Sequence, residues 1–223
     1  MQTDMTVGKP MKMILDFTIP VFIGNVFQQF YNMADAIIVG KFVGTKGLAA
    51  VGSTGTIMFL IIGFLMGLTA GFTVLTSQKF GAGKMDEMRQ SVGNAALLSI
   101  IISVIMTAVS MVGMHSLLTL MHTPEDIFQD AYTYIMIISA GIIATIFYNL
   151  FSSYLRAVGN SKIPLVFLVF SAALNVILDL VLIINFKMGV AGAAWATIIS
   201  QGVSAILCLG YIYIRMPSLA PNR

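Results

Sequence analysis

The sequence predicts an all-α integral membrane protein with six transmembrane helices, and three observations carry that prediction. Of its 223 residues, 58% are apolar and only 9% are charged, with a mean hydropathy of +0.93. A soluble domain carries about 25% charged residues, so this composition excludes a water-soluble globule and a disordered chain. The single cysteine excludes a disulfide scaffold. A helix needs roughly 20 apolar residues to cross a bilayer, so the length allows about six crossings.

Six apolar segments are separated by charges, glycines and prolines. They are 13–39, 48–78, 91–120, 127–154, 163–185 and 190–214. None alternates apolar and polar residues with a period of two, which favours helices over the strands of a barrel. The second, third and fourth segments exceed a perpendicular crossing, so we expect them to tilt or protrude. We therefore predict a cytoplasmic tail at 1–12, a six-helix membrane lobe at 13–214 and a cytoplasmic segment at 215–223.

The first segment carries a polar stripe and a proline. At 100° per residue its polar side chains fall within an arc of about 120°; they are Asn25, Gln28, Gln29, Asn32 and Asp35. A carboxylate deep in the bilayer is costly unless it faces a cavity or a partner, so Asp35 is a candidate functional residue. Pro20 precedes the stripe, and because proline removes a backbone hydrogen bond we expect it to bend the helix.

The second segment contains glycines at a spacing of four, which are Gly63, Gly67 and Gly71. Small residues at this spacing allow close helix–helix packing in membranes, and we expect this seam to pack against a neighbouring helix.

The fifth and sixth segments carry two further polar stripes. Ser171, Asn175 and Asp179 recur every four residues in the fifth. The stripe of the sixth consists of Thr197, Ser200, Gln201 and Ser204. Interhelical hydrogen bonding explains any one stripe, but three stripes together predict a shared polar chamber.

The two deep carboxyl groups are expected at the same depth. Asp35 lies six residues before Lys41, and Asp179 lies eight residues before Lys187. At about 1.5 Å per residue, each carboxyl lies roughly 10 Å below the same surface. If these helices adjoin, the carboxylates repel each other and the site binds a proton or a small cation such as Na⁺. The alternative is that both are structural carboxyls, each hydrogen-bonded to a neighbouring helix.

The distribution of basic residues predicts the orientation. With the N-terminus inside, nine basic residues share one side: Lys9, Lys12, Lys79, Lys84, Arg89, Arg156, Lys162, Arg215 and Arg223. The other side holds only Lys41, Lys46 and Lys187. Because cytoplasmic loops are enriched in Lys and Arg, we expect both termini on the cytoplasmic side of the plasma membrane. The basic residues are scattered along the loops rather than clustered, so nucleic acid is not an expected partner.

Enzyme signatures are missing from the sequence. It contains no Walker A motif, dinucleotide fingerprint, Ser-His-Asp arrangement or HExxH motif, and we expect neither an enzyme nor a cofactor or bound metal beyond Na⁺. Two intramembrane aspartates also raise the possibility of an aspartyl protease. Such a protease requires a Gly-x-Gly-Asp context, whereas Asp179 follows Val-Ile-Leu.

Four motifs give the chain a family resemblance. The first is the opening helix, in which Pro20 is followed by Asp35 and then by Ile-Ile-Val-Gly at 37–40. The others are the glycine-containing run at 67–83, the Leu-Arg-Ala-Val-Gly-Asn-Ser-Lys-Ile-Pro loop at 155–164, and Asn175-x-x-x-Asp179 followed by 189–197. In order and spacing these motifs resemble those of the MATE (multidrug and toxic compound extrusion) transporters.

The resemblance implies a cation-coupled antiporter that exports organic, often cationic, compounds by using a proton or sodium gradient. The implied cation site comprises Asp35, Asn175, Asp179, Thr197 and a tyrosine of the fourth helix. We place this tyrosine at Tyr134, with Tyr132 and Tyr148 as competitors. Leu180 stands where many relatives have proline, which removes proline as a source of bending there.

The family fold has two lobes of six helices, whereas this chain matches only the N-terminal lobe. It is therefore expected to be a fragment, or to pair with a C-terminal lobe or a second chain. Two alternatives remain: a lipid or lipid-linked sugar flippase of the related superfamily, and an inactive or regulatory half-transporter. Flippases usually carry more cationic residues in the central cavity, and here we expect no Lys or Arg within a helix core.

Overall fold

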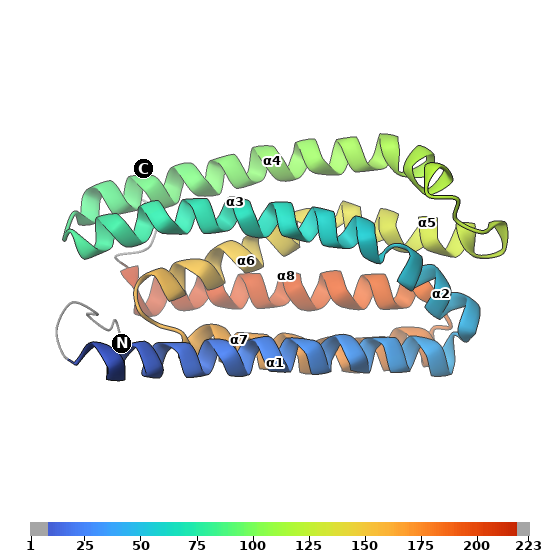
Figure 1. The fold of residues 1–223 in the computed structure, drawn as a ribbon, viewed down its shortest axis with the longest axis horizontal. Coiled ribbons are helices and arrows are strands. Elements are labelled where there is room, and N and C mark those ends of the chain that lie inside the picture. Colours follow the sequence, from blue (N-terminus) through green and yellow to red (C-terminus); the bar gives the residue numbers. More distant parts are fainter. Residues whose placement is uncertain (1–8, 218–223) are drawn as a thin grey trace.

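Long helices cross the molecule from end to end, and consecutive crossings run in opposite directions (Figure 1). The computed structural model describes residues 9–217, which contain helices and no strands. The elements are α1 Pro10–Phe42, α2 Thr45–Ser53, α3 Gly55–Gly81, α4 Met85–Leu120, α5 Glu125–Ala140, α6 Ile142–Ala157, α7 Lys162–Leu180, η1 Val181–Asn185 and α8 Val190–Arg215. The predicted all-α fold class is confirmed.

The prediction of six crossings is also confirmed. Five uninterrupted stretches are long and apolar enough to span a membrane, and a sixth span is formed by the bent pair α5 and α6. Many large apolar side chains on these helices are exposed, among them Phe22, Phe59 and Val112. Such a surface is unfavourable in water and suits contact with lipid tails.

Two of the predicted segments are not continuous helices. The second segment is broken at Thr54, which separates α2 from α3. There the Ser53 and Thr54 hydroxyls donate to the backbone carbonyls of Ala50 and Val51, competing with the helical hydrogen bonds.

The fourth segment is bent by 51° between α5 and α6. The break is at Gly141, where an added Cβ would lie 2.3 Å from the Cδ1 atom of Ile198. Only glycine fits so close to α8, and glycine is also a weak helix former.

Helix α7 ends in a π-helical turn, η1, two residues after Asp179. Wide turns of this kind often occur at functional sites in helices. The turn changes the winding of the helix although Leu180, and not proline, follows Asp179.

Helix α1 continues through Pro20 without a break from Pro10 to Phe42. Pro20 is buried, and because proline has no backbone N–H it removes one internal hydrogen bond without ending the helix. A bending role for Pro20 stays a prediction.

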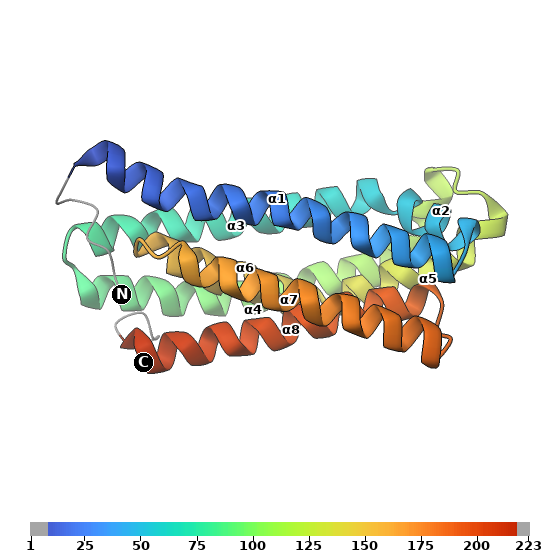
Figure 2. The same ribbon diagram turned by 90° about the horizontal axis from the view of Figure 1, so that it is seen from below.

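Helix α8 is the centre of the packing. It contacts α5, α6 and α7, while α1 lies beside α7 and α4 lies beside α3 (Figures 1 and 2). This arrangement places the first, fifth and sixth crossings, which carry the predicted polar stripes, next to one another.

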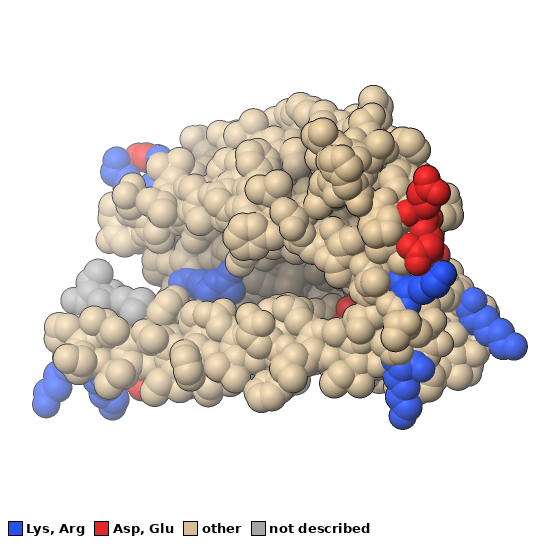
Figure 3. Space-filling model, turned by 45° about the vertical axis from the view of Figure 1, so that its right-hand side comes forward, with Lys and Arg blue, Asp and Glu red and all other residues tan. Residues whose placement is uncertain are grey.

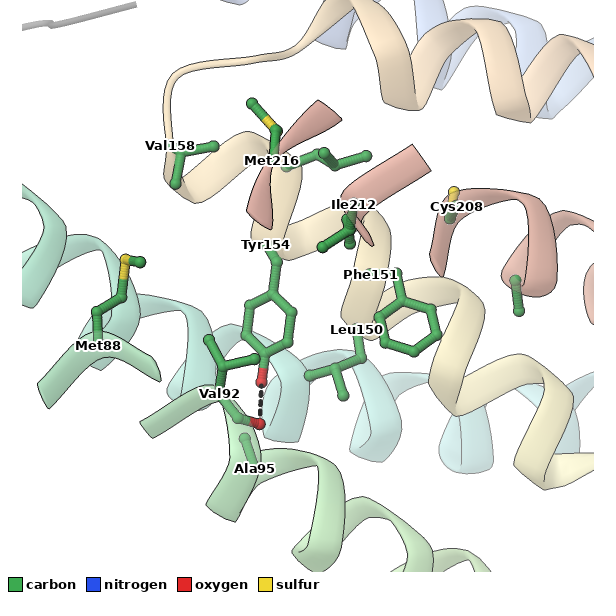
Figure 4. Close-up of a cluster of buried hydrophobic side chains, with 12 residues drawn as sticks. Met88, Val92, Ala95, Leu150, Phe151, Tyr154, Val158, Cys208, Ile212 and Met216 are labelled. Atoms are coloured by element: carbon green, nitrogen blue, oxygen red, sulfur yellow. Dashed lines mark hydrogen bonds between the residues drawn. The ribbon is translucent and has the colours of Figure 1, made fainter. Parts of the chain in front are cut away.

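A buried cluster near the end where α8 finishes joins α4, α6 and α8. Figure 4 shows Tyr154 of α6 pointing towards α4, where its hydroxyl donates to the Val92 carbonyl at 3.5 Å. Val158 and Met216 close the same cluster. The cluster fixes the last turn of α6 against α4 and α8.

The predicted glycine seam does not pack within the described part of the chain. A Cβ added at Gly63, Gly67 or Gly71 would meet nothing within 4 Å. These glycines lie on an open face of α3, because α3 contacts α4 and α6 through its other faces.

The basic residues divide between the two ends of the bundle as the sequence predicts. Lys41 lies in the last turn of α1, Lys46 in the first turn of α2 and Lys187 between η1 and α8, all at one end of the bundle. The described basic residues of the larger group lie towards the other end. Arg223 lies outside the described residues. Arg156 differs from the expectation of a loop position, because it lies within the last turn of α6.

Candidate functional site

Two aspartates from neighbouring helices meet inside the bundle. Asp179 of α7 is fully buried, and Asp35 of α1 is partly exposed. Their carboxyl groups are close enough to hydrogen bond to each other. Such a bond forms only when one carboxyl holds a proton, since a carboxylate is an acceptor only. The structure thus brings together the two residues that the sequence singled out.

Asn175 organises the site from one turn before Asp179 on α7. The orientation that satisfies both amide atoms has Nδ2 donating to Oδ2 of Asp179 at 3.0 Å. Its oxygen then accepts from the Tyr31 hydroxyl at 3.2 Å and from the Thr197 backbone N–H at 3.1 Å. One fully buried amide therefore connects α1, α7 and α8.

Thr197 takes part through its backbone and its hydroxyl. The hydroxyl donates to the Ala193 carbonyl at 3.0 Å, one turn earlier on α8. The Thr197 side chain also lies close to the hydroxyl of Tyr31. Thr197 thus belongs to the same polar cluster.

Tyr134 of α5 lies close enough to Asp35 and Asp179 to interact electrostatically with both. It is buried at 7% exposure. Its competitor Tyr132 packs instead against the rings of His115 and Phe128. Tyr148 of α6 lines two cavities, one of which is also lined by Tyr31.

Tyr31 is a member of the cluster that the sequence analysis did not identify. It lies one turn before Asp35 on α1, at a spacing of four, and three residues after Gln28. Its direction on the helical wheel is about 40° outside the predicted arc. Tyrosine is also counted among the apolar residues, so the pattern of polar residues on the first helix does not include Tyr31.

The predicted polar stripes divide into inward and outward residues. Gln28, Ser171 and Gln201 line a cavity of about 20 Å³ together with Tyr31 and Tyr148, and a cavity of this size holds about one water molecule. The Thr145 hydroxyl donates to Gln201 at 2.5 Å. Asn25 lines a larger cavity nearby, as does Pro20.

Gln29, Asn32 and Asn25 are all exposed on α1, and of these three residues only Asn25 lines one of the two cavities.

The chemistry of the carboxyl pair suits a proton or a small cation. The Oδ1 atoms of Asp35 and Asp179 are both buried and have no hydrogen-bond partner. No Lys or Arg forms a salt bridge with either residue in the described part of the chain. Buried carboxyl oxygens without partners are costly, and a bound proton or oxygen-seeking cation relieves that cost.

Comparison with known proteins gives consistent matches. The MatE family model matches residues 20–181. The "Probable multidrug resistance protein YpnP" of Bacillus subtilis is 34% identical over 94% of this chain and 47% of its own length. YoeA of the same organism, also called a probable multidrug resistance protein, is 28% identical over 88% of this chain and 43% of its own length.

A solved structure agrees with these sequence matches. It is described as the outward-facing conformation of a multidrug resistance MATE family transporter, and it superposes with a TM-score of 0.89 at 28% identity. The match covers 97% of this chain and 48% of the other. The chain therefore spans about half the length of the relatives it matches, which agrees with the expectation of one N-terminal lobe.

Proposed function

Because this chain belongs to the MatE family of membrane transporters, we propose that it works in the cation-coupled export of drug-like organic compounds. The observation that carries the proposal is the pair formed by Asp35 and Asp179, two deep carboxyl groups with unpartnered oxygens. Multidrug resistance proteins among the relatives support the class of substrate.

The coupling ion in this proposal is H⁺ or Na⁺, bound by Asp35 and Asp179 with Asn175, Thr197 and Tyr134 around them. When the ion is bound, the carboxyl groups no longer repel each other, and α1 stays against α7. When it leaves, the repulsion between two carboxylates favours separation of the two helices. An ion that binds one arrangement more tightly shifts the population towards it, which is the basis of alternating access.

Export by this mechanism requires a cleft with two walls, so the proposed partner is a C-terminal lobe or a second copy of this chain. The substrate is expected to be a small organic compound, in the main cationic, that reaches the cleft from the cytoplasm or the lipid. Pro20 is the proposed point at which α1 bends during the change.

Reconstitution into liposomes tests the proposal. With an imposed pH or Na⁺ gradient, the protein is expected to exchange a fluorescent organic cation such as ethidium. Asp35→Asn and Asp179→Asn should each abolish the gradient-dependent part of the exchange, because a neutral amide cannot release a proton or hold a cation.

The matched control is Asp16→Asn, which removes an exposed carboxyl group from the same helix and should leave exchange unchanged. Exchange at the original rate in Asp35→Asn would refute the coupling role of the pair.

A further inference from the structure

A cavity of about 300 Å³ lies between α1, α3, α6 and α7, on the side of Gln28 away from the aspartate pair. The space-filling view shows the surface hollowed between the layer of α1 and the helices above it, with basic atoms at one end of the hollow and acidic atoms at the other (Figure 3). Arg156 is the basic residue that lines the cavity. It also lines an adjoining cavity of about 350 Å³ between α3 and α6.

The local fold of α6 directs Arg156 into this space. Tyr154 and Leu155 are buried in the cluster with α4 and α8 (Figure 4). Because Arg156 is two residues after Tyr154, it points to the opposite side of the helix. Its Nη2 atom donates to the Ser153 hydroxyl at 2.9 Å, which holds the guanidinium beside the cavity.

This guanidinium has no acidic partner in the described part of the chain. None of the salt bridges there involves Arg156. Neither cavity is lined by an Asp or a Glu; their polar lining residues are uncharged apart from Arg156 and include Asn149, Ser152 and Ser153. A partly buried charge without a counter-charge is unfavourable, so the site favours a ligand that brings negative charge.

The beginning of α7 adds a second source of positive potential. Ser161, which directly precedes α7, and Pro164 in its first turn line the same cavity. Among the first N–H groups of the helix, that of Ile163 donates to Oδ1 of Asn160 at 3.2 Å. The N-terminal end of a 19-residue helix still carries a partial positive charge from its aligned peptide dipoles, which favours an anion nearby.

We propose that this cavity binds an oxyanion group, a phosphate or a carboxylate, of a small amphiphilic molecule. The Arg156 guanidinium contacts the oxyanion with paired N–H donors, which is the geometry that arginine offers to phosphates and carboxylates. The apolar part of the ligand lies against Val21, Leu165 and Leu168. The site goes beyond cation-coupled export, since its ligand carries the opposite charge and its occupancy requires no ion gradient.

Equilibrium binding tests the proposal. The full chain is placed in phosphatidylcholine nanodiscs and titrated calorimetrically with 1-naphthyl phosphate, 1-naphthol and 1-naphthylmethylamine. We expect the phosphate to bind at least about tenfold more tightly than the other two compounds, because hydrogen bonds between charged groups are the strong ones. R156Q should remove this preference, and R156K should keep part of it.

Lys12→Gln is the matched control, because it removes an exposed positive charge from the same end of the bundle without touching the cavity. It should bind the phosphate as tightly as the original protein. The preference of the original protein for the phosphate tests the proposal even if R156Q fails to fold.

Nanodiscs that contain phosphatidylglycerol distinguish the two sources of the oxyanion. If the ligand is a lipid headgroup, native mass spectrometry should find phosphatidylglycerol retained by the original protein and lost from R156Q. Phosphatidylglycerol should then also weaken the binding of naphthyl phosphate. If the ligand is a free solute, phosphatidylglycerol should not compete with naphthyl phosphate.

The proposal is overturned if neither naphthyl phosphate binding nor lipid retention depends on Arg156, or if the three naphthyl compounds bind equally. Because no transport is measured, these results are independent of the test of export.

Discussion

At the scale of single residues, the site depends on one buried amide that fixes the surroundings of two acids. Asn175 satisfies Asp179 Oδ2 and at the same time accepts from Tyr31 and from the backbone of Thr197. Asp179 is therefore held in place, while one oxygen of each acid remains without a partner. A site that is rigid except at the atoms that bind the ion suits reversible binding, because little conformational freedom is lost when the ion enters.

Tyr31→Phe tests the part played by the residue that the sequence analysis missed. Removal of the hydroxyl takes one hydrogen bond from the Asn175 oxygen and leaves the packing of the ring intact. We expect the apparent affinity for the coupling ion to fall roughly two- to tenfold, the range for one hydrogen bond. The measurement is exchange in liposomes as a function of H⁺ and Na⁺ concentration.

Tyr132→Phe is the control for this experiment, because Tyr132 packs on His115 and Phe128 away from the acids. It should leave the ion dependence unchanged. An equal effect of both substitutions, or none in Tyr31→Phe, would contradict the assigned role.

At the scale of the elements, the breaks in the helices follow from local chemistry and from close packing. The break at Thr54 comes with hydroxyls that bond to nearby carbonyls. The bend at Gly141 comes from the approach of Ile198 on α8. The π-helical turn η1 begins two residues after Asp179. Each of these breaks changes the direction or the winding of a helix that contacts α8 or that carries a residue of the site.

Gly141→Ala should destabilise the bundle, because the new Cβ would lie 2.3 Å from the Ile198 side chain. Overpacking of this kind costs about 1–3 kcal/mol. Thermal unfolding in detergent is expected to show a Tm lower by several degrees. Gly63→Ala is the matched control, since nothing lies within 4 Å of its Cβ position.

A second variant checks the cause of this effect. Combining Gly141→Ala with Ile198→Ala should cost less than the sum of the two single changes, because the clash disappears. Strict additivity would show that the bend does not depend on the contact with Ile198.

At the scale of the whole molecule, the antiparallel crossings bring the first, fifth and sixth segments together around one polar site. The same topology leaves both ends of the described chain at one end of the bundle (Figure 1). The larger group of basic residues lies at that end, which favours the cytoplasmic orientation.

Labelling with a membrane-impermeant maleimide tests this orientation. In a Cys208→Ser background, Lys46→Cys should react in intact cells, and Lys162→Cys should react only after the membrane is opened. Both lysines are exposed, whereas Cys208 is buried. The reverse pattern of labelling would place the termini outside.

The membrane class, the six crossings and the two deep acids could all be predicted from the order of the amino acids. Each of these follows from properties that a residue carries wherever it lies: apolar length, hydrogen-bonding capacity and charge. The packing of the helices is what brings Asp35 close to Asp179 and the Tyr31 hydroxyl to the Asn175 oxygen. It also places Tyr134 near enough to both acids to interact with them electrostatically. It also turned Arg156 from an expected loop residue into the lining of a cavity, and it exposed Gln29 and Asn32. The physical reason is that such placements depend on the rotation of each helix and on the neighbours against which it packs, which no single helix encodes.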